Sequence, residues 1–261
     1  MFNLLIYYIK KFLPRKDRIS SNFQYRHYLF NELIDNIDTS NFEHFRILEI
    51  GPRDGEDSQR LASLNPKDFF IIDLPNRTKN NLDWIKNLNI TPDYLEGNLM
   101  YFSDEDLSKI GKFDLIWFTG VLYHNPEQLR FIKKLYNLLN DKGYLVLESS
   151  TVRSLSLRNK NVVQIHYPDT FRDTDTITHL PSKKAIKSWL SMSGFFQIID
   201  SKCFNFENYN IKNTRYACIA IKTKDSKPKK YYSNNWRGKY ASDGGVLTNQ
   251  AIHLSDTLVY N

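Results

Sequence analysis

Residues 47–55 read Ile-Leu-Glu-Ile-Gly-Pro-Arg-Asp-Gly, and this stretch decides the fold class. An apolar run ends near an acid, Glu49, and two glycines follow it, Gly51 and Gly55. Glycine allows tight turns and lets the backbone pass close to a ligand. Open α/β sheets bind ligands at the carboxyl ends of their strands. The stretch therefore predicts a buried strand, a ligand-binding turn and then a helix.

Short apolar runs alternate with longer amphipathic segments in the rest of the chain. We expect strands at Arg46–Ile50, Phe69–Leu74, Tyr94–Gly97, Phe113–Thr119, Tyr144–Ser149, Phe195–Ser201 and Tyr216–Thr223. We expect helices from the glycine turn to about Leu64, around Trp84–Leu88, and over Glu127–Leu139 and Lys183–Ser193. This pattern is typical of a parallel sheet covered on both faces. The predicted fold is α/β and Rossmann-like, with a seven-stranded, mostly parallel sheet and an antiparallel hairpin at its edge.

One domain is expected over residues 46–223. Residues 1–45 are expected to form an N-terminal helical extension, with helices over Phe2–Leu13 and about Ser21–Ile37. Residues 151–180 have no clear helical period and are expected to cover a substrate. Residues 224–261 begin as a polar stretch and become aromatic again, so we expect a tail that packs on the domain or on a second subunit.

The composition is that of an ordinary globular protein, with 41% hydrophobic and 25% charged residues in 261. Two cysteines and no metal-ligand spacing favour a reducing, cytoplasmic setting without a metal site. No secretory signal or membrane span is expected, because the first apolar run is short. That run is interpreted as a helix packed on the domain, on a homodimer partner or on a membrane surface. The net charge of +7 fits a solvated Lys-rich surface, a nucleic-acid partner or a small anionic substrate.

The spacing of the glycines argues against a dinucleotide. A pyrophosphate site needs three glycines in the order G-x-G-x-x-G, whereas Gly51 and Gly55 follow an acid and give G-x-x-x-G. A carboxylate at that place suits a cationic ligand. Asp73 ends the next strand, where a carboxylate can accept hydrogen bonds from both ribose hydroxyls.

Four motifs in this order resemble the class I S-adenosylmethionine (SAM)-dependent methyltransferases. They are Glu49-Ile50-Gly51, Asp73, Asn98 and residues 113–124 with the turn Asp141-Lys142-Gly143. The family often has an acid where this chain has Asn98. The resemblance implies SAM as cofactor and S-adenosylhomocysteine (SAH) as product. The residues it assigns to cofactor binding are Glu49, Gly51, Arg53, Gly55, Asp73, Leu74, Asn98, Leu99 and Thr119.

A narrower resemblance links residues 120–124 and 180–190 to the tRNA wobble-uridine carboxymethyltransferase family. That family has a larger N-terminal domain and basic residues where Asn125-Pro126 follows here. We therefore predict a shared scaffold with a different substrate: a small metabolite that is anionic (phosphate, phosphoramidate or carboxylate bearing) or glycan-related, in bacterial surface-polysaccharide biosynthesis. A tRNA-modifying methyl- or carboxymethyltransferase and a non-catalytic SAM-binding protein are the alternatives.

Tyr123 and His124 follow the fourth strand and are the predicted catalytic pair. The unperturbed pKa of histidine is near neutral, so His124 is the candidate general base. The alternative is that His124 starts a helix and only forms a hydrogen bond to the loop. Tyr123 is alternatively a wall of the cofactor pocket, and Glu148 either faces substrate or pairs with an arginine. Arginine grips anions bidentately, and the remaining substrate candidates in the cover are Arg153, Arg158, His166, Tyr167, Arg172 and His179.

Overall fold

The computed structural model describes residues 24–37, 39–75, 83–154, 156–168, 176–204 and 214–223. The helix expected over Phe2–Leu13, the tail from residue 224 and Arg172 lie outside these ranges.

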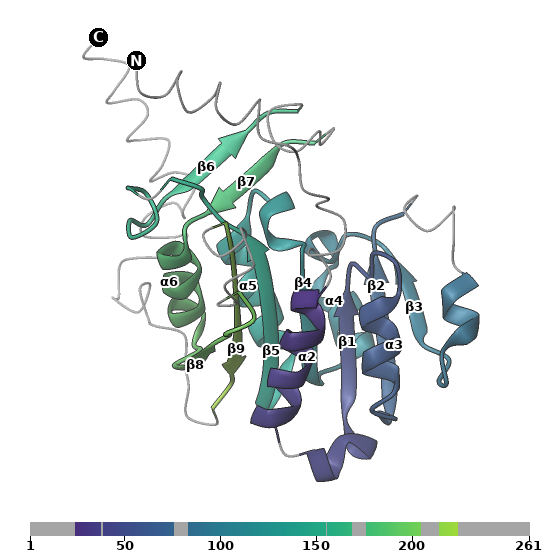
Figure 1. The fold of residues 1–261 in the computed structure, drawn as a ribbon. Helices are drawn as coiled ribbons and strands as arrows, with labels where there is room; N and C mark the ends of the chain where they lie inside the picture. The colour runs from purple at the N-terminus through teal and green to yellow at the C-terminus, as the bar shows by residue number, and fades with distance from the viewer. Residues whose placement is uncertain are drawn as a thin grey trace, which may run out of the picture.

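A seven-stranded sheet forms the centre of the domain (Figure 1). Its strand order is β3-β2-β1-β4-β5-β9-β8. The strands are β1 (Arg46–Ile50), β2 (Asp68–Asp73), β3 (Asp93–Glu96), β4 (Phe113–Thr119), β5 (Leu139–Ser150), β8 (Gln197–Asp200) and β9 (Arg215–Ile221). The first five strands pair in parallel, while β9 is antiparallel to both β5 and β8. The predicted α/β fold with its antiparallel edge hairpin is confirmed.

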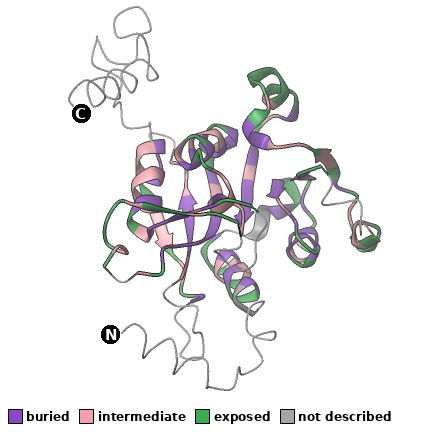
Figure 2. Ribbon diagram, turned by 90° about the horizontal axis from the view of Figure 1, so that it is seen from above, coloured by how far each residue is buried: buried purple, intermediate pink, exposed green. Residues whose placement is uncertain are grey.

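Helices cover both faces of the sheet because alternate strand residues point to opposite sides. On one side α2 (Gln24–Asn36) and α3 (Glu56–Ala62) pack on a core that includes Ile47, Leu115 and Trp117. On the other side α4 (Asp104–Ile110), α5 (Gln128–Leu138) and α6 (Lys183–Ser193) pack on a second core. The central strands are accordingly buried in Figure 2.

Helix α2 belongs to the core that includes Ile47, Leu115 and Trp117, although the helix precedes β1. Leu29, Leu33 and Ile37 are buried in it together with Phe42 of the short 3₁₀ helix η1 (Thr39–His44). The part of the expected N-terminal extension that is described is therefore integral to the domain.

Several element predictions were wrong in detail. Among the described residues from 83 onward, the helix expected around Trp84–Leu88 is a short 3₁₀ helix, η2 (Asp83–Asn87). Helix α4 was not predicted, although Ser103 and Asp106 form a capping box at its start. Strand β5 begins earlier than expected and contains an irregular turn, with Lys142 at φ 66°.

The cover between β5 and α6 contains a second, two-stranded sheet that was also not predicted. Strands β6 (Val163–His166) and β7 (Thr178–Pro181) pair antiparallel, with Ile165 opposite His179. This hairpin lies above the carboxyl ends of the central strands in Figure 1. Val163, Gln164 and Ile165 of β6 are exposed, so this strand lacks the continuous apolar run that marks the buried strands of the central sheet.

Within the described ranges, no helix has the length and apolar character needed to cross a membrane.

Candidate functional site

A cavity of about 720 Å³ opens at the carboxyl ends of β1, β2 and β4. Such a volume is within the usual range for small-molecule sites, roughly 300–1,000 Å³. Its walls come from the ends of β1, β2 and β4, the four loops that follow β1, β2, β3 and β4, helices α2 and α5, the first residue of β9 and the residue two before β7. The lining residues are Arg26, Ile50, Gly51, Arg53, Ile72, Asp73, Leu74, Gly97, Asn98, Leu99, Thr119, Gly120, Val121, Tyr123, His124, Asn125, Phe131, Thr176 and Arg215.

The glycine turn after β1 forms one wall. Gly51 has φ +72°, and a Cβ at this position would lie 2.7 Å from Cγ2 of Val121, which also lines the cavity. Gly55 has φ +80° and begins α3, where a Cβ would lie 2.4 Å from the ring of Trp84. Gly55 does not line the cavity, so its lack of a side chain serves packing.

Glu49 lies beneath the turn and does not line the cavity. Only 2% of the residue is exposed, and its carboxylate accepts a 2.5 Å hydrogen bond from the Ser58 hydroxyl. Burial, followed by the nearby negative charge of Asp57, raises the pKa of Glu49 to about 8. Glu49 therefore supports the glycine turn from below and does not contact a ligand in the cavity.

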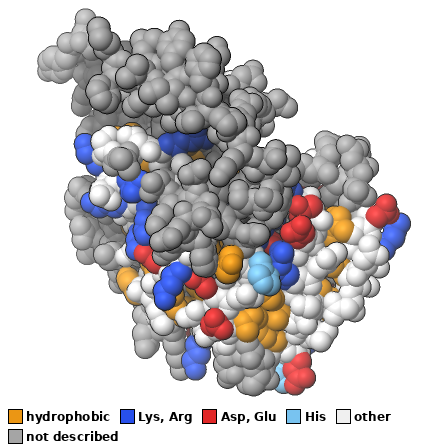
Figure 3. Space-filling view, viewed as in Figure 1, with side chains coloured by type: hydrophobic (Ala, Val, Ile, Leu, Met, Phe, Trp, Pro, Cys, Tyr) orange, Lys and Arg blue, Asp and Glu red, His pale blue; other side chains and the backbone are white. Residues whose placement is uncertain are grey.

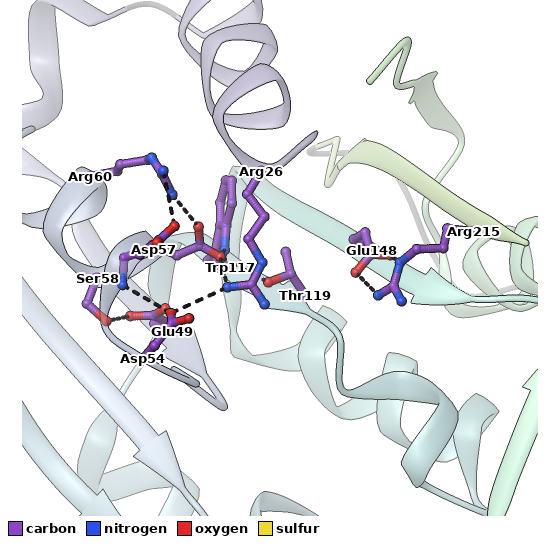
Figure 4. Close-up of polar contacts among 11 residues, drawn as sticks. Arg26, Glu49, Asp54, Asp57, Ser58, Arg60, Trp117, Thr119, Glu148 and Arg215 are labelled. Atoms are coloured by element: carbon purple, nitrogen blue, oxygen red, sulfur yellow. Dashed lines mark hydrogen bonds and ion pairs between the residues drawn. The ribbon is translucent and has the colours of Figure 1, made fainter. Parts of the chain in front are cut away.

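Asp57 organises the polar floor beside Glu49 (Figure 4). Its carboxylate lies 3.4 Å from a guanidinium nitrogen of Arg26 and accepts a 3.1 Å hydrogen bond from the indole of Trp117. The hydroxyl of Thr119 donates to the same oxygen at 3.4 Å, and Arg60 donates to the other oxygen at 2.9 Å. Arg26 of α2 is thus held at the wall of the cavity by a buried carboxylate.

The ends of β2 and β3 supply the adjoining part of the wall. Asp73 accepts a 2.8 Å hydrogen bond from the Leu74 backbone through one carboxylate oxygen. Asn98 uses its side-chain oxygen to accept from the Met100 backbone at 3.0 Å, which caps the short 3₁₀ helix η3 (Leu99–Tyr101). The amide NH₂ of Asn98 is the part of the side chain that can then donate to a ligand.

Tyr123 and His124 lie in the 3₁₀ helix η4 (Leu122–His124), which follows β4. Both line the cavity, and their ring centroids are 4.1 Å apart. The guanidinium of Arg215 lies 5.9 Å from the centre of the Tyr123 ring. The sequence-predicted catalytic pair is therefore brought to the same cavity as the predicted cofactor residues.

Arg215 is fixed at this end by a buried carboxylate. Glu148 has no exposed surface and accepts two hydrogen bonds from the Arg215 guanidinium, while Ser150 accepts a third at 2.9 Å (Figure 4). Of the two alternatives for Glu148, pairing with an arginine is the one present.

The substrate candidates of the cover are placed differently. Arg153, Arg158, His166, Tyr167 and His179 do not line the cavity, and Tyr167 is 67% exposed. Burial lowers the pKa of His179, which favours its neutral form. From the cover as described, Thr176 is the residue that reaches the cavity.

Sequence reasoning missed Arg26, Arg215 and Thr176. Arg26 precedes the first motif by a whole helix, and Arg215 begins the last strand, so neither belongs to a local motif. The one local signal was for Arg215, a charged residue directly before the apolar run of β9.

Charge is unevenly spread among the described residues on the face seen in Figure 3. Figure 3 shows Lys and Arg side chains gathered on the side of α6 and the β6–β7 hairpin. Across the described ranges, no three His, Cys, Asp or Glu side chains are grouped as metal ligands would be.

A family described as "Methyltransferase domain" matches residues 25–198. The chain is 26% identical over 159 residues to the tRNA U34 carboxymethyltransferase of Campylobacter jejuni, which is 60% of this chain and 52% of that protein. It is 25% identical over 144 residues to the corresponding protein of Vibrio cholerae, 55% of this chain and 40% of that protein. The chain thus spans about half the length of these relatives.

Solved structures share the fold at low identity. The N-terminal domain of EvdMO1, solved in the presence of SAH and D-fucose, is 14% identical with a TM-score of 0.58, over 77% of this chain and 84% of that chain. The N-methyltransferase NodS from Bradyrhizobium japonicum, in complex with SAH, is 15% identical with a TM-score of 0.52, over 77% and 89%.

Proposed function

This chain belongs to the methyltransferase domain family, with SAM as its cofactor, and from that premise we propose that it methylates a small anionic or glycan-related metabolite. The observation that carries the proposal is the cavity itself. The motif residues Gly51, Asp73 and Asn98 line it together with Tyr123 and His124.

We propose that the cofactor lies along the strand ends. Asp73 would accept hydrogen bonds from the ribose hydroxyls, and Asn98 would donate from its amide to the base. Gly51 lets the ligand approach the backbone. Arg26, anchored by Asp57, provides a guanidinium that suits a carboxylate.

SAM supplies an activated methyl group on a sulfonium, and the protein aligns the acceptor with it. An in-line displacement depends on alignment, and an acceptor that carries a proton also needs a base. His124 is the proposed base, because its imidazole lies in the cavity and ordinarily titrates near neutral pH. Tyr123 and Arg215 form the wall beside it and are proposed to orient the acceptor.

Calorimetric titration with SAM and SAH tests the cofactor part of this proposal. Binding is expected, and it also argues against a purely structural protein. Mass spectrometry can then follow methyl transfer to extracted anionic metabolites and to intermediates of surface-polysaccharide synthesis. Activity confined to RNA would contradict the small-molecule acceptor.

The similarity to tRNA U34 carboxymethyltransferases favours a second candidate, modification of the tRNA wobble uridine. The basic side of the molecule is compatible with a polyanion. A tRNA gel shift that weakens steeply with salt supports this candidate. Absence of any shift at low salt removes it.

A further inference from the structure

Gln128, the first residue of α5, connects two walls of the cavity. It is 3% exposed, and its Nε2 donates to the carbonyl oxygen of Leu122 at 3.1 Å and to that of His179 at 2.6 Å. Leu122 begins η4, which carries Tyr123 and His124. His179 lies in β7 of the cover hairpin. One side-chain amide therefore ties the catalytic segment to the cover.

The two carbonyl groups differ in how far they depend on this amide. The Leu122 carbonyl also accepts a 3.1 Å hydrogen bond from the Asn125 N–H. His179 lies opposite Ile165, and because the Ser182 N–H donates to Val162 in the same pair of strands, the alternation of the ladder directs the His179 carbonyl away from β6 and toward Gln128. Meanwhile Oε1 of Gln128 is buried, and no hydrogen-bond partner for it is found in the described part of the chain. Leaving an acceptor buried in this way is unfavourable. An apolar side chain of the same length would avoid that cost, so the contribution specific to the amide is its pair of N–H bonds.

The two connected elements, η4 and β7, are in contact with each other beside the cavity. Leu180 of β7 packs in a small cluster with Val152 and Tyr123, while Thr176, just before β7, lines the cavity. A shift of β7 relative to η4 would therefore change the separation of Thr176 and Tyr123, both of which line the cavity.

We propose that Gln128 is a positioning residue, which holds η4 against β7 so that Tyr123 and His124 keep their places at the acceptor end of the cavity. The catalytic meaning of this inference rests on the proposed function. The mechanical coupling does not, because it can be measured without an acceptor.

Hydrogen exchange of the full chain tests the coupling. Gln128→Met keeps the length of the side chain and removes both donors. Protection factors are expected to fall about tenfold for amides of η4 and of β7, and to stay within about twofold in β4 and α6. Gln164→Met is the matched control, since it makes the same change at an exposed site of the same hairpin. This control is expected to leave η4 unchanged.

Gln128→Glu adds a reversible test. The introduced carboxylic acid retains one donor while it is protonated, whereas its ionised form faces two carbonyl oxygens. Protection of η4 is therefore expected to recover on acidification in this variant alone. Unchanged protection of η4 in Gln128→Met, or an equal loss throughout the domain, overturns the positioning role. SAH titration of the same proteins separates the two proposals: no binding to the wild type contradicts the proposed function, whatever the exchange data show.

Discussion

Replacement of the buried carboxylic acid Glu49 by glutamine is the sharpest test of the electrostatics beneath the site. Burial and the charge of Asp57 raise the pKa of Glu49 from 4.5 to about 8. One pKa unit corresponds to about 1.4 kcal/mol, so ionised Glu49 costs the folded state up to about 5 kcal/mol relative to the unfolded chain. The amide introduced by Glu49→Gln would retain an acceptor for the Ser58 hydroxyl and cannot ionise.

The sign of the pH dependence of stability follows from the number of protons that the folded and unfolded states bind. Below pH 4.5 both states hold the proton and the cost is absent. Between pH 4.5 and about 8 the unfolded chain has released its proton while the folded chain keeps it. Because the unfolded state then binds fewer protons, this group makes stability fall as pH rises, and the loss is complete above about pH 8.

Urea denaturation followed by circular dichroism at pH values of about 4, 6, 8 and 9, which bracket the two pKa values, measures this effect. The free energy of unfolding of Glu49→Gln relative to the wild type is expected to rise with pH, by several kcal/mol in total. Glu105→Gln, which changes a carboxylate that is 78% exposed, is the matched control and is expected to follow the wild type. Parallel pH profiles for the wild type and Glu49→Gln would refute the reasoning.

Other substitutions separate binding from packing and chemistry. Gly51→Val forces a β-branched residue to φ +72° against Val121, so SAH affinity is expected to fall beyond detection in calorimetry. An affinity within about threefold of the wild type would exclude a close approach of the cofactor to this turn. Gly55→Ala is expected to lower stability by about 1–3 kcal/mol through contact with Trp84, yet to spare SAH affinity once folded, and a selective loss of binding would contradict its packing role. Asp73→Asn is expected to weaken SAH binding about tenfold or more, as measured by the same titration, and unchanged affinity would remove Asp73 from the ribose site. His124→Asn is expected to keep SAH affinity but to lose transfer at neutral pH in the mass-spectrometric assay, and wild-type turnover would eliminate His124 as the base.

The central strands and the site residues at their ends could be predicted from local sequence patterns. The strands β1, β2 and β4 have continuous apolar runs because both faces of the sheet are covered, and their ends carry Gly51, Asp73 and Tyr123-His124 to one edge. That edge required no long-range information, since parallel strands place all their carboxyl ends together.

The cavity residues that could not be predicted are placed by packing between segments that are distant in the sequence. Arg26 reaches the cavity because α2 packs across the sheet and Asp57 holds its guanidinium. Arg215 reaches it because β9 inserts between β5 and β8, beside the buried Glu148. Strand β6 of the cover is largely exposed and has no continuous apolar run, so the histidines and arginines of the cover were predicted as substrate residues from their nearness in the sequence alone.

A crystal structure of the protein with SAH tests the central claim most directly. The account predicts that the ribose lies on Asp73, the adenine beside Asn98 and the sulfur at the end of the cavity where Tyr123 and His124 meet. SAH bound elsewhere, or an orientation with the sulfur directed away from η4, would contradict it.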